Sequence, residues 1–144
     1  MKVNKSMQEE KIKKLKEKGV NFLDEESVQI RGKLECGKDV EIDSNVLFEG
    51  EVKLLDSVKI GPNVTIKDSI VHSNTTIKAF SLLNGSAIGS SCTVGPYARL
   101  RVGAEIGDNC QIGNFVEIKN SKIESGCRIN HMAFIGDAIL GKDV

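Results

Sequence analysis

Two cationic side chains, Arg101 and Lys119, stand eighteen residues apart in this chain of 144 residues. Arginine offers a planar fork of N–H donors and lysine a compact positive charge, and both bind phosphate groups. If the fold stacks them, two cations about 5 Å apart repel each other unless an anion lies beside them. The pair therefore indicates a phosphate-binding corner, although two side chains that extend into water would have the same spacing.

Two further residues, Glu117 and His131, carry groups that could act near this pair. Imidazole is the usual general base in enzymes because it changes charge close to neutral pH. A glutamate two residues before Lys119 either orients a neighbour or is simply solvated. His72 is expected to be a surface residue with no chemical role, and a single exposed histidine such as His131 is equally consistent with none. Spacing alone assigns no mechanism.

The fold that has to position these residues is indicated by apolar side chains that return about every sixth position. Six is not a helical period, and simple strand alternation does not single out every sixth residue. Hexapeptide repeats form short parallel strands wound into a solenoid. We therefore predict an all-β fold, a parallel β-helix with three hexads per coil, in which residues eighteen apart stack about 4.8 Å apart. The predicted first inward column is Ile30, Cys36, Ile42, Phe48, Leu54, Ile60, Ile66, Val71, Ile77, Leu82, Ile88, Val94, Leu100, Ile106, Ile112, Ile118, Ile123, Ile129, Ile135 and Leu140.

A second inward column follows four residues after the first and has smaller side chains. Positions i and i+4 point to the same face of an extended segment, so the two columns together fill a narrow tube. A glycine directly follows a residue of the first column eight times. At these positions we expect corners of the prism, where the backbone needs unusual angles or approaches the next coil closely. The predicted second column is Leu34, Val40, Val46, Val52, Val58, Val64, Ile70, Thr75, Ser81, Ser86, Cys92, Ala98, Ala104, Cys110, Val116, Cys127, Ala133 and Ile139.

The four cysteines all fall in these two columns, and no two of them form a C-x-x-C pair. A buried cysteine behaves as a small apolar side chain. The register therefore predicts that these thiols pack in the core, and we expect neither a disulfide nor a metal site.

The charge balance bears on possible partners. Twenty acidic and twenty basic residues give a net charge of zero, and the aromatic residues are five Phe and one Tyr. This composition argues against a nucleic-acid groove or an anionic membrane surface. No apolar stretch approaches the roughly 20 residues that span a bilayer, and the N-terminus is too charged for a signal peptide. We expect a single domain located in the cytoplasm.

The two ends of the chain differ from the repeats. We predict that residues 1–19 form a short N-terminal α-helix, acting as linker or cap, and that residues 20–144 form the β-helix. Residues 6–9 (SMQE) match a capping box, and Gly19 is a suitable helix stop. The helix has few apolar residues, so it should lean on the first coils. The sequence stops at Val144 within a coil and without an atypical cap, so the β-helix is expected to be incomplete at its C-terminus.

Several runs of residues resemble the C-terminal half of the bacterial bifunctional enzyme N-acetylglucosamine-1-phosphate uridylyltransferase / glucosamine-1-phosphate acetyltransferase. The most specific runs are residues 94–101 (VGPYARLR) and 113–119 (GNFVEIK). Residues 31–43, His131 and residues 135–138 (IGDA) add to them, and the resemblance extends from about residue 12 to the end. It implies a left-handed parallel β-helix that assembles as a homotrimer, with acetyl-transfer sites between neighbouring subunits.

The resemblance also implies an activity. The family transfers acetyl from acetyl-CoA to the amine of glucosamine 1-phosphate, in the synthesis of UDP-N-acetylglucosamine for peptidoglycan and lipopolysaccharide. His131 matches the family's catalytic base, and Arg101 and Lys119 match its contacts to the sugar phosphate. Glu117 matches a glutamate that is a weaker candidate for supporting the site.

Departures from the family pattern limit what is carried over. Phe134 replaces a substrate-holding tyrosine and lacks its hydroxyl, and Val102 replaces a proline. The coils that supply a substrate asparagine, a lysine and most of the acetyl-CoA groove would lie beyond Val144, and the uridylyltransferase domain is absent. The resemblance thus implies a weak or inactive acetyltransferase fragment. The alternative is a non-catalytic trimeric β-helix scaffold.

Two other activities occur on the same predicted fold. A metal-dependent hydratase needs several histidine ligands, and the chain has only His72 and His131. Acetylation of a different sugar or amino acid stays open on fold alone, because a fold does not determine its substrate. The runs around Arg101 and Lys119 favour the sugar phosphate.

Overall fold

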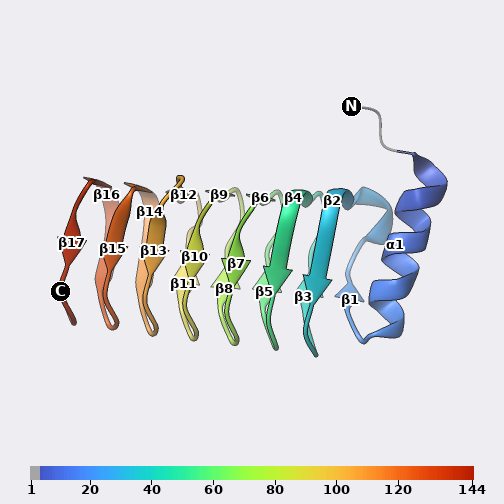
Figure 1. Ribbon diagram of the computed structural model, residues 1–144, viewed down its shortest axis with the longest axis horizontal. Helices are drawn as coiled ribbons and strands as arrows, with labels where there is room; N and C mark the ends of the chain where they lie inside the picture. The colour runs from blue at the N-terminus through green and yellow to red at the C-terminus, as the bar shows by residue number, and fades with distance from the viewer. Residues whose placement is uncertain (1–3) are drawn as a thin grey trace.

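The computed structural model describes residues 4–144, which form a three-sided parallel β-helix with one α-helix across its N-terminal end (Figure 1). The described residues contain seventeen strands in one continuous sheet. Each strand pairs with the equivalent strand one coil away, for example Ile42 with Ile60 and Ile60 with Ile77. The step of eighteen residues is the spacing that three hexads per coil predict, and the step of seventeen is one residue shorter.

The strands lie in three faces. The first face contains β1 (Asn21–Phe22), β3 (Glu41–Ile42), β5 (Lys59–Ile60), β8 (Thr76–Ile77), β11 (Thr93–Val94) and the first halves of β14 (Gln111–Lys119) and β16 (Arg128–Gly136). The second face contains the first halves of β2 (Gln29–Cys36) and β4 (Leu47–Leu54), then β6 (Thr65–Lys67), β9 (Leu82–Asn84), β12 (Arg99–Leu100) and the second halves of β14 and β16. The third face contains the second halves of β2 and β4, then β7 (Ile70–Val71), β10 (Ala87–Ile88), β13 (Ala104–Ile106), β15 (Ser121–Ile123) and β17 (Ile139–Leu140).

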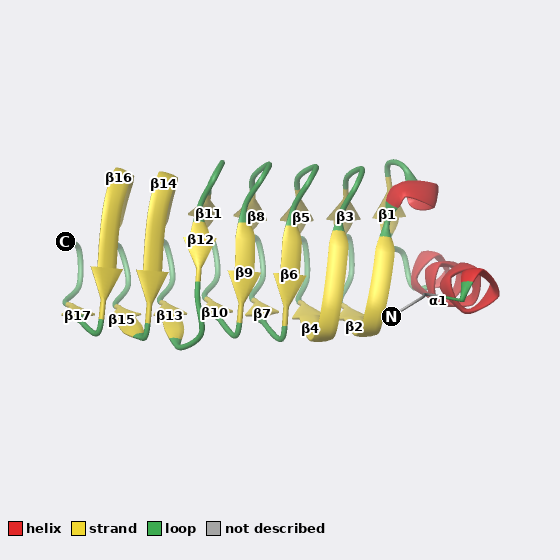
Figure 2. Ribbon diagram, turned by 90° about the horizontal axis from the view of Figure 1, so that it is seen from above, coloured by secondary structure: helices red, strands yellow, loops and turns green. Residues whose placement is uncertain are grey.

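The longest strands bend around an edge of the prism instead of stopping at it. β2 and β4 bend between the second and third faces at Gly32 and Gly50, which have φ of 136° and 66°. β14 and β16 bend between the first and second faces at Phe115 and Met132, with φ of 58° and 50°. Figure 2 shows these four as the long strands, two near each end of the β-helix. Because β14 and β16 bend at Phe115 and Met132, the candidate site residues on these strands are divided between the first and second faces.

Side chains of the predicted columns form one apolar core that runs the length of the β-helix. Three predicted inward residues are wrong. Leu82 and Ile139 are exposed and Ile70 is only partly buried, while Leu83 and Ser69 are buried and Ala138 is partly buried. In each case the side between two edges is one residue shorter than a hexad, so the neighbouring residue turns inward. The buried hydroxyl of Ser69 donates to the carbonyl of Lys67, 2.7 Å away, which satisfies it.

The corners follow a different rule from the predicted one. Eleven of the fifteen described non-glycine residues with positive φ are Asn, Asp or Ser, such as Asn45, Asn63 and Asn109 with φ of 57°, 58° and 57°. Most of the predicted corner glycines have ordinary angles. They are needed because the next coil is close: a Cβ on Gly107 would lie 2.8 Å from the backbone nitrogen of Ser125. Close approach, and not unusual backbone angles, explains such a glycine.

The prediction that the cysteine side chains pack in the core is confirmed. Cys92, Cys110 and Cys127 are buried and stack in one column, Cys36 is partly buried, and all four are free thiols. Burial raises the pKa of the Cys92 thiol to about 11 and that of Cys36 to about 12. The Sγ of Cys92 lies 3.0 Å from the carbonyl oxygen of Gly107, to which the thiol donates. The thiols of Cys36 and Cys92 are therefore protonated core groups at neutral pH.

The helix α1 (Lys5–Glu17) closes the first coil. Its N-cap is Asn4, whose side chain accepts from the backbone of Ser6 and Met7, so the predicted capping box at Ser6 is wrong. Gly19 does follow the helix end, with φ of 98°. Ile12 and Leu15, only 6% exposed each, cover the open cross-section of the core, as expected for a helix that leans on the first coils.

The side chain of Gln8 closes the exposed edge of β2 as a strand would. Its Nε2 donates to the carbonyl of Ile30 at 2.6 Å, and its Oε1 accepts from the N–H of Ile30 at 2.7 Å. Lys11 Nζ donates to the carbonyl of Gly32 at 2.8 Å. An unpaired strand edge is a site for unwanted pairing, and these contacts occupy it. Within residues 4–144 no helix is long and apolar enough to cross a membrane.

Candidate active site

The structure stacks Arg101 and Lys119 on the second face, at adjacent coils. The pairing of β12 with β14 aligns Arg99 with Glu117 and Leu100 with Ile118. The backbone N–H of Arg101 then donates to the carbonyl of Ile118 at 2.8 Å, so the next pair in register is Arg101 with Lys119. Two cations therefore emerge side by side at the corner where the second face meets the third.

Carboxylates neutralise both cations. The Oε2 of Glu117 lies 2.9 Å from the Nη1 of Arg101 and 3.7 Å from the Nη1 of Arg99. The Nζ of Lys119 lies 3.8 Å from the Oδ2 of Asp137. The side chains of Arg101 and Lys119 are about 40% exposed. Ion pairs of this exposure contribute only about 0–1 kcal/mol, so an incoming phosphate could replace the carboxylates.

Sequence reasoning missed two members of this cluster, Arg99 and Asp137. The spacing of eighteen residues could have found both, because Arg99 lies eighteen residues before Glu117 and Asp137 lies eighteen residues after Lys119. The cluster lines a shallow cleft of about 560 Å³ on the second face. Its walls are formed by Leu82, Asn84, Arg99, Leu100, Arg101, Val102, Lys119, Asn120 and Asp137.

His131 lies on the first face, directly before the edge that this face shares with the second face. It pairs with Asn114 of β14 and is exposed, next to the bend of β16 at Met132. Gly136, at the far end of β16, pairs with Lys119. Five residues of extended strand span about 16 Å, and the bend shortens this path. The second face thus brings together Arg101, Glu117 and Lys119 and leaves His131 at the opposite edge.

Phe134 lies between the histidine and the cations. It pairs with Glu117 across β14 and β16, and it is 61% exposed. Its ring covers Gly136, because a Cβ on that glycine would lie 2.8 Å from the Cζ of Phe134. The surface between His131 and Lys119 is therefore an aromatic ring without a hydrogen-bonding group.

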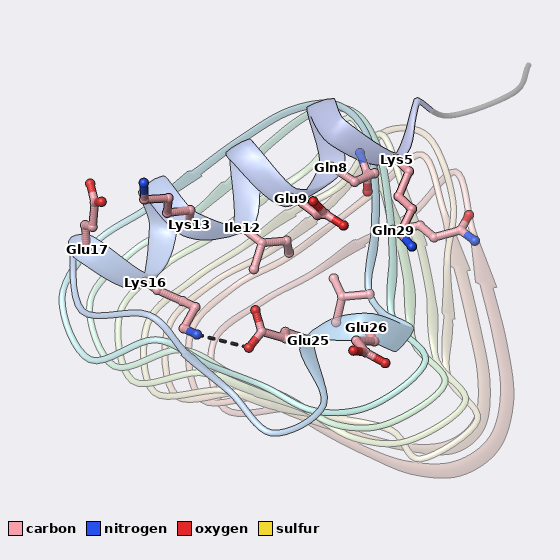
Figure 3. A pocket seen from close by; sticks show the side chains of 11 residues that line it. Lys5, Gln8, Glu9, Ile12, Lys13, Lys16, Glu17, Glu25, Glu26 and Gln29 are labelled. Atoms are coloured by element: carbon pink, nitrogen blue, oxygen red, sulfur yellow. Dashed lines mark hydrogen bonds and ion pairs between the residues drawn. The ribbon is translucent and has the colours of Figure 1, made fainter.

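A larger cleft lies elsewhere, between α1 and the first coil (Figure 3). It measures about 1080 Å³ and is lined by charged side chains of both signs. Lys16 and Glu25 form an ion pair across it, with Nζ and Oε1 3.0 Å apart. None of the candidate site residues borders this cleft, and within residues 4–144 no cluster of three or more His, Cys, Asp or Glu side chains suits a metal ion.

Family models match two parts of the chain. The model described as the GMPPB C-terminal domain matches residues 30–105, more than half of the chain. The model described as bacterial transferase hexapeptide (six repeats) matches residues 103–137. Together they cover the coils from β2 to the end of β16. The left-handed parallel β-helix implied by the sequence resemblance is confirmed.

Curated relatives match almost the whole chain. "Bifunctional protein GlmU" of Nitrosospira multiformis is 47% identical over 91% of this chain, and that of Azoarcus sp. is 44% identical over 91%. The corresponding protein of Burkholderia vietnamiensis is 44% identical over 88%. The matched region is 28–29% of the length of each relative. The chain therefore belongs to the GMPPB C-terminal domain family of hexapeptide-repeat proteins and is homologous to the C-terminal acetyltransferase part of GlmU.

Proposed function

We propose that this chain binds glucosamine 1-phosphate and contributes to the transfer of acetyl from acetyl-CoA to its amine, in UDP-N-acetylglucosamine synthesis. The observation that carries the proposal is the stacked pair of Arg101 and Lys119, in which Arg101 pairs with the carboxylate of Glu117 and Lys119 with that of Asp137. A phosphate between the two cations would take over both ion pairs. Because Arg101 presents a fork and Lys119 a point charge, they suit a terminal phosphate group.

In this proposal the second face orients the sugar. The phosphate lies at the corner of Arg101 and Lys119, and the sugar extends over Phe134 toward His131. Glu117 is a positioning residue that holds Arg101 before the phosphate arrives. Phe134 offers its ring as an apolar support for the sugar, without a hydroxyl that could donate to it.

His131 would act as the general base. Its neutral imidazole takes a proton from the sugar amine while the amine nitrogen attacks the thioester carbonyl carbon of acetyl-CoA. The carbon–nitrogen bond forms, the carbon–sulfur bond breaks, and the sulfur leaves as the thiol of coenzyme A after receiving a proton. The exposure of His131 leaves room for both substrates beside it.

Assembly is part of the same proposal. The relatives are about three and a half times as long as the matched region, and the resemblance implies that neighbouring subunits of a homotrimer and further coils complete the acetyl-CoA groove. On its own, this chain is expected to bind the sugar phosphate and to transfer acetyl slowly or not at all. The second candidate function is a non-catalytic trimeric scaffold, which the apolar Phe134 in place of a tyrosine favours.

Thiol release from acetyl-CoA in the presence of glucosamine 1-phosphate tests the proposal, with this chain and with a form extended by further coils. We expect release from the extended form, lost in His131→Ala, and calorimetric binding of the sugar phosphate by both forms. Binding that disappears in Arg101→Ala supports the phosphate site. If neither form binds the sugar phosphate or releases thiol, the scaffold is the correct function.

A further inference from the structure

A third cation, Arg99, stands beside the stacked pair of Arg101 and Lys119. The pairing of β12 with β14 sets Arg99 directly opposite Glu117, two residues before Arg101 on the same outward side of the chain. Its side chain is 57% exposed. Its Nη1 lies 3.7 Å from the Oε2 of Glu117, which is close enough for an ion pair but too long for a hydrogen bond. Arg99 is therefore a cation that its carboxylate neighbour holds only loosely.

One carboxylate oxygen lies between the two arginines. The Oε2 of Glu117 also lies 2.9 Å from the Nη1 of Arg101, from which it accepts a hydrogen bond. Arg99 is nevertheless the residue in register with Glu117, and strands of neighbouring coils are only about 4.8 Å apart. The carboxylate leans toward Arg101 in the structure, and a small rotation of its side chain would bring it within hydrogen-bonding distance of Arg99.

A phosphate group that binds to Arg101 competes with this carboxylate. Both groups are anions, and both would contact the same guanidinium. Like charges about 4 Å apart at a protein surface repel each other by several times the thermal energy. Phosphate binding is therefore opposed unless the carboxylate of Glu117 moves to another cation.

The second carboxylate of this corner already has another partner. The Oδ2 of Asp137 lies 3.8 Å from the Nζ of Lys119, while its Oδ1 accepts a hydrogen bond of 2.8 Å from the Nδ2 of Asn120. That amide would hold Asp137 after a phosphate had taken Lys119. Within residues 4–144 the carboxylate of Glu117 has no such amide, and its contacts are the two arginines.

The charge of the cluster supports the same role for Arg99. Arg99, Arg101 and Lys119 face two carboxylates, which gives the corner a net charge of +1. Without Arg99 the cations and the carboxylates cancel, and the corner loses its net attraction for an anion. An arginine suits this position because its guanidinium keeps its charge and offers several N–H donors to a carboxylate that changes partner.

We propose that Arg99 is a positioning residue that receives the carboxylate of Glu117 when a phosphate group binds to Arg101. The guanidinium of Arg99 pairs with Glu117 and does not touch the phosphate. The exchange moves one ion pair to the neighbouring arginine and leaves Arg101 and Lys119 to the phosphate. This assignment rests on the proposed function, because it describes how that same site admits its substrate.

A double-mutant cycle followed by isothermal titration calorimetry tests the proposal, with glucosamine 1-phosphate and with inorganic phosphate as ligands. Low salt keeps the screening of these exposed charges small. We expect Arg99→Gln to weaken binding of both ligands about 10-fold, because Glu117 is then left beside the phosphate. In the Glu117→Gln background the same change should alter binding by less than about 2-fold, because no carboxylate has to move.

Two further variants separate this role from a structural one. Arg99→Lys keeps the positive charge and should bind both ligands within about 3-fold of the wild type. Arg31→Gln removes an equal charge from the ion pair with Glu49 in the first coils, and should leave binding unchanged. Because both arginines are exposed, all of these variants should melt at the wild-type temperature.

The possible results are distinct. An equal loss from Arg99→Gln in both backgrounds would mean that Arg99 contacts the phosphate directly, and no loss in either would mean that it takes no part. Either result, a failure of lysine to restore binding, or a similar loss in Arg31→Gln overturns the assignment. The expected coupling with inorganic phosphate, in a chain that does not bind glucosamine 1-phosphate, would support the role of Arg99 and refute only the proposed function. Failure to bind either ligand would overturn both.

Discussion

The first and the last coils of the second face share one frame but carry different side chains. Arg31 and Arg101 stand in the same outward column, four coils apart. In the first coils Glu49 separates the cations Arg31 and Lys67 within that column, whereas in the later coils Arg101 stacks directly on Lys119. The opposite edge of the second face changes as well, from Asn45 and Asn63 to Phe80, Tyr97 and Phe115. The comparison teaches that the core residues specify the prism. The functional residues are the outward ones that depart from the repeating pattern.

If both regions share one core, a charge in either should destroy it. Ile60→Asp and Ile112→Asp each place a carboxylate in a position that is at most 2% exposed. We expect each to lower the free energy of unfolding by more than about 4 kcal/mol, because the buried charge has no partner. Thermal melting followed by circular dichroism measures this. Ile139→Asp, at a position 76% exposed, is the control, and a similar loss there would contradict a common core.

The inner columns predict that the stability of the later coils responds to alkaline pH. Val40 and Val58 fill the column that continues as Cys92, Cys110 and Cys127. Burial raises the pKa of Cys92 from 9.0 to about 11, so its stabilising contribution is complete below pH 9 and is lost as the pH rises through 11. The free energy of unfolding should fall by up to about 3 kcal/mol over this interval. Denaturant titrations at pH 8 and 11 should show a smaller loss in Cys92→Val, and an unchanged loss would remove the thiol as its source.

The two arginines of the shared column make a matched pair. Arg101→Ala should weaken binding of glucosamine 1-phosphate by about 10–100-fold, the value of a charge-assisted contact to phosphate. Arg31→Ala should leave binding unchanged, since the ion pair of Arg31 with Glu49, at 3.8 Å, lies far along the axis. Isothermal titration calorimetry compares them. Equal losses in both variants would show that the sugar phosphate binds by net charge and not at the stacked corner.

The hydrogen bonds between Gln8 and Ile30 should contribute the smallest of these effects on stability. In Gln8→Glu the new carboxylate still accepts from the N–H of Ile30 but no longer donates to its carbonyl. We expect the free energy of unfolding to fall by about 1–2 kcal/mol, because the partly buried carbonyl loses its donor. Glu10→Gln, an exposed change on the same helix, should alter it by less than about 0.5 kcal/mol. Urea titration distinguishes them, and equal values would mean that Gln8 contributes no more than an ordinary surface residue.

Much of the fold was predictable because a closed tube needs an apolar residue at fixed intervals. The errors share one cause. Ile70, Leu82 and Ile139 each stand immediately before another apolar residue, as in Ile70–Val71, Leu82–Leu83 and Ile139–Leu140. In such a pair the period does not tell which residue points inward, and the length of the side between two edges decides. From the sequence alone, a side of five residues cannot be distinguished from a side of six until the position of its corner residue is known.

Site residues could be predicted only where the spacing along the chain is enough to determine which residues stack in adjacent coils. The stacking of Arg101 and Lys119 followed from a spacing of eighteen, and the same rule reaches Arg99 and Asp137. The aromatic residues at the edge between the first and second faces could not be predicted, because Phe80, Tyr97 and Phe115 adopt a conformation that their residue types disfavour. Local preference predicts asparagine there, and the structure overrides it.

The amide of Gln8 has a consequence for how this protein ends a repetitive structure. A β-helix with an open first coil is a template onto which strands of other molecules add, and growth of that kind leads to filaments. One side-chain amide, with a donor and an acceptor at peptide spacing, imitates the missing neighbour at Ile30 and halts such growth. Termination therefore depends on a thirteen-residue helix instead of a further coil. A helix of this design, placed before the first coil of another solenoid of the same cross-section, would serve as a transferable stop.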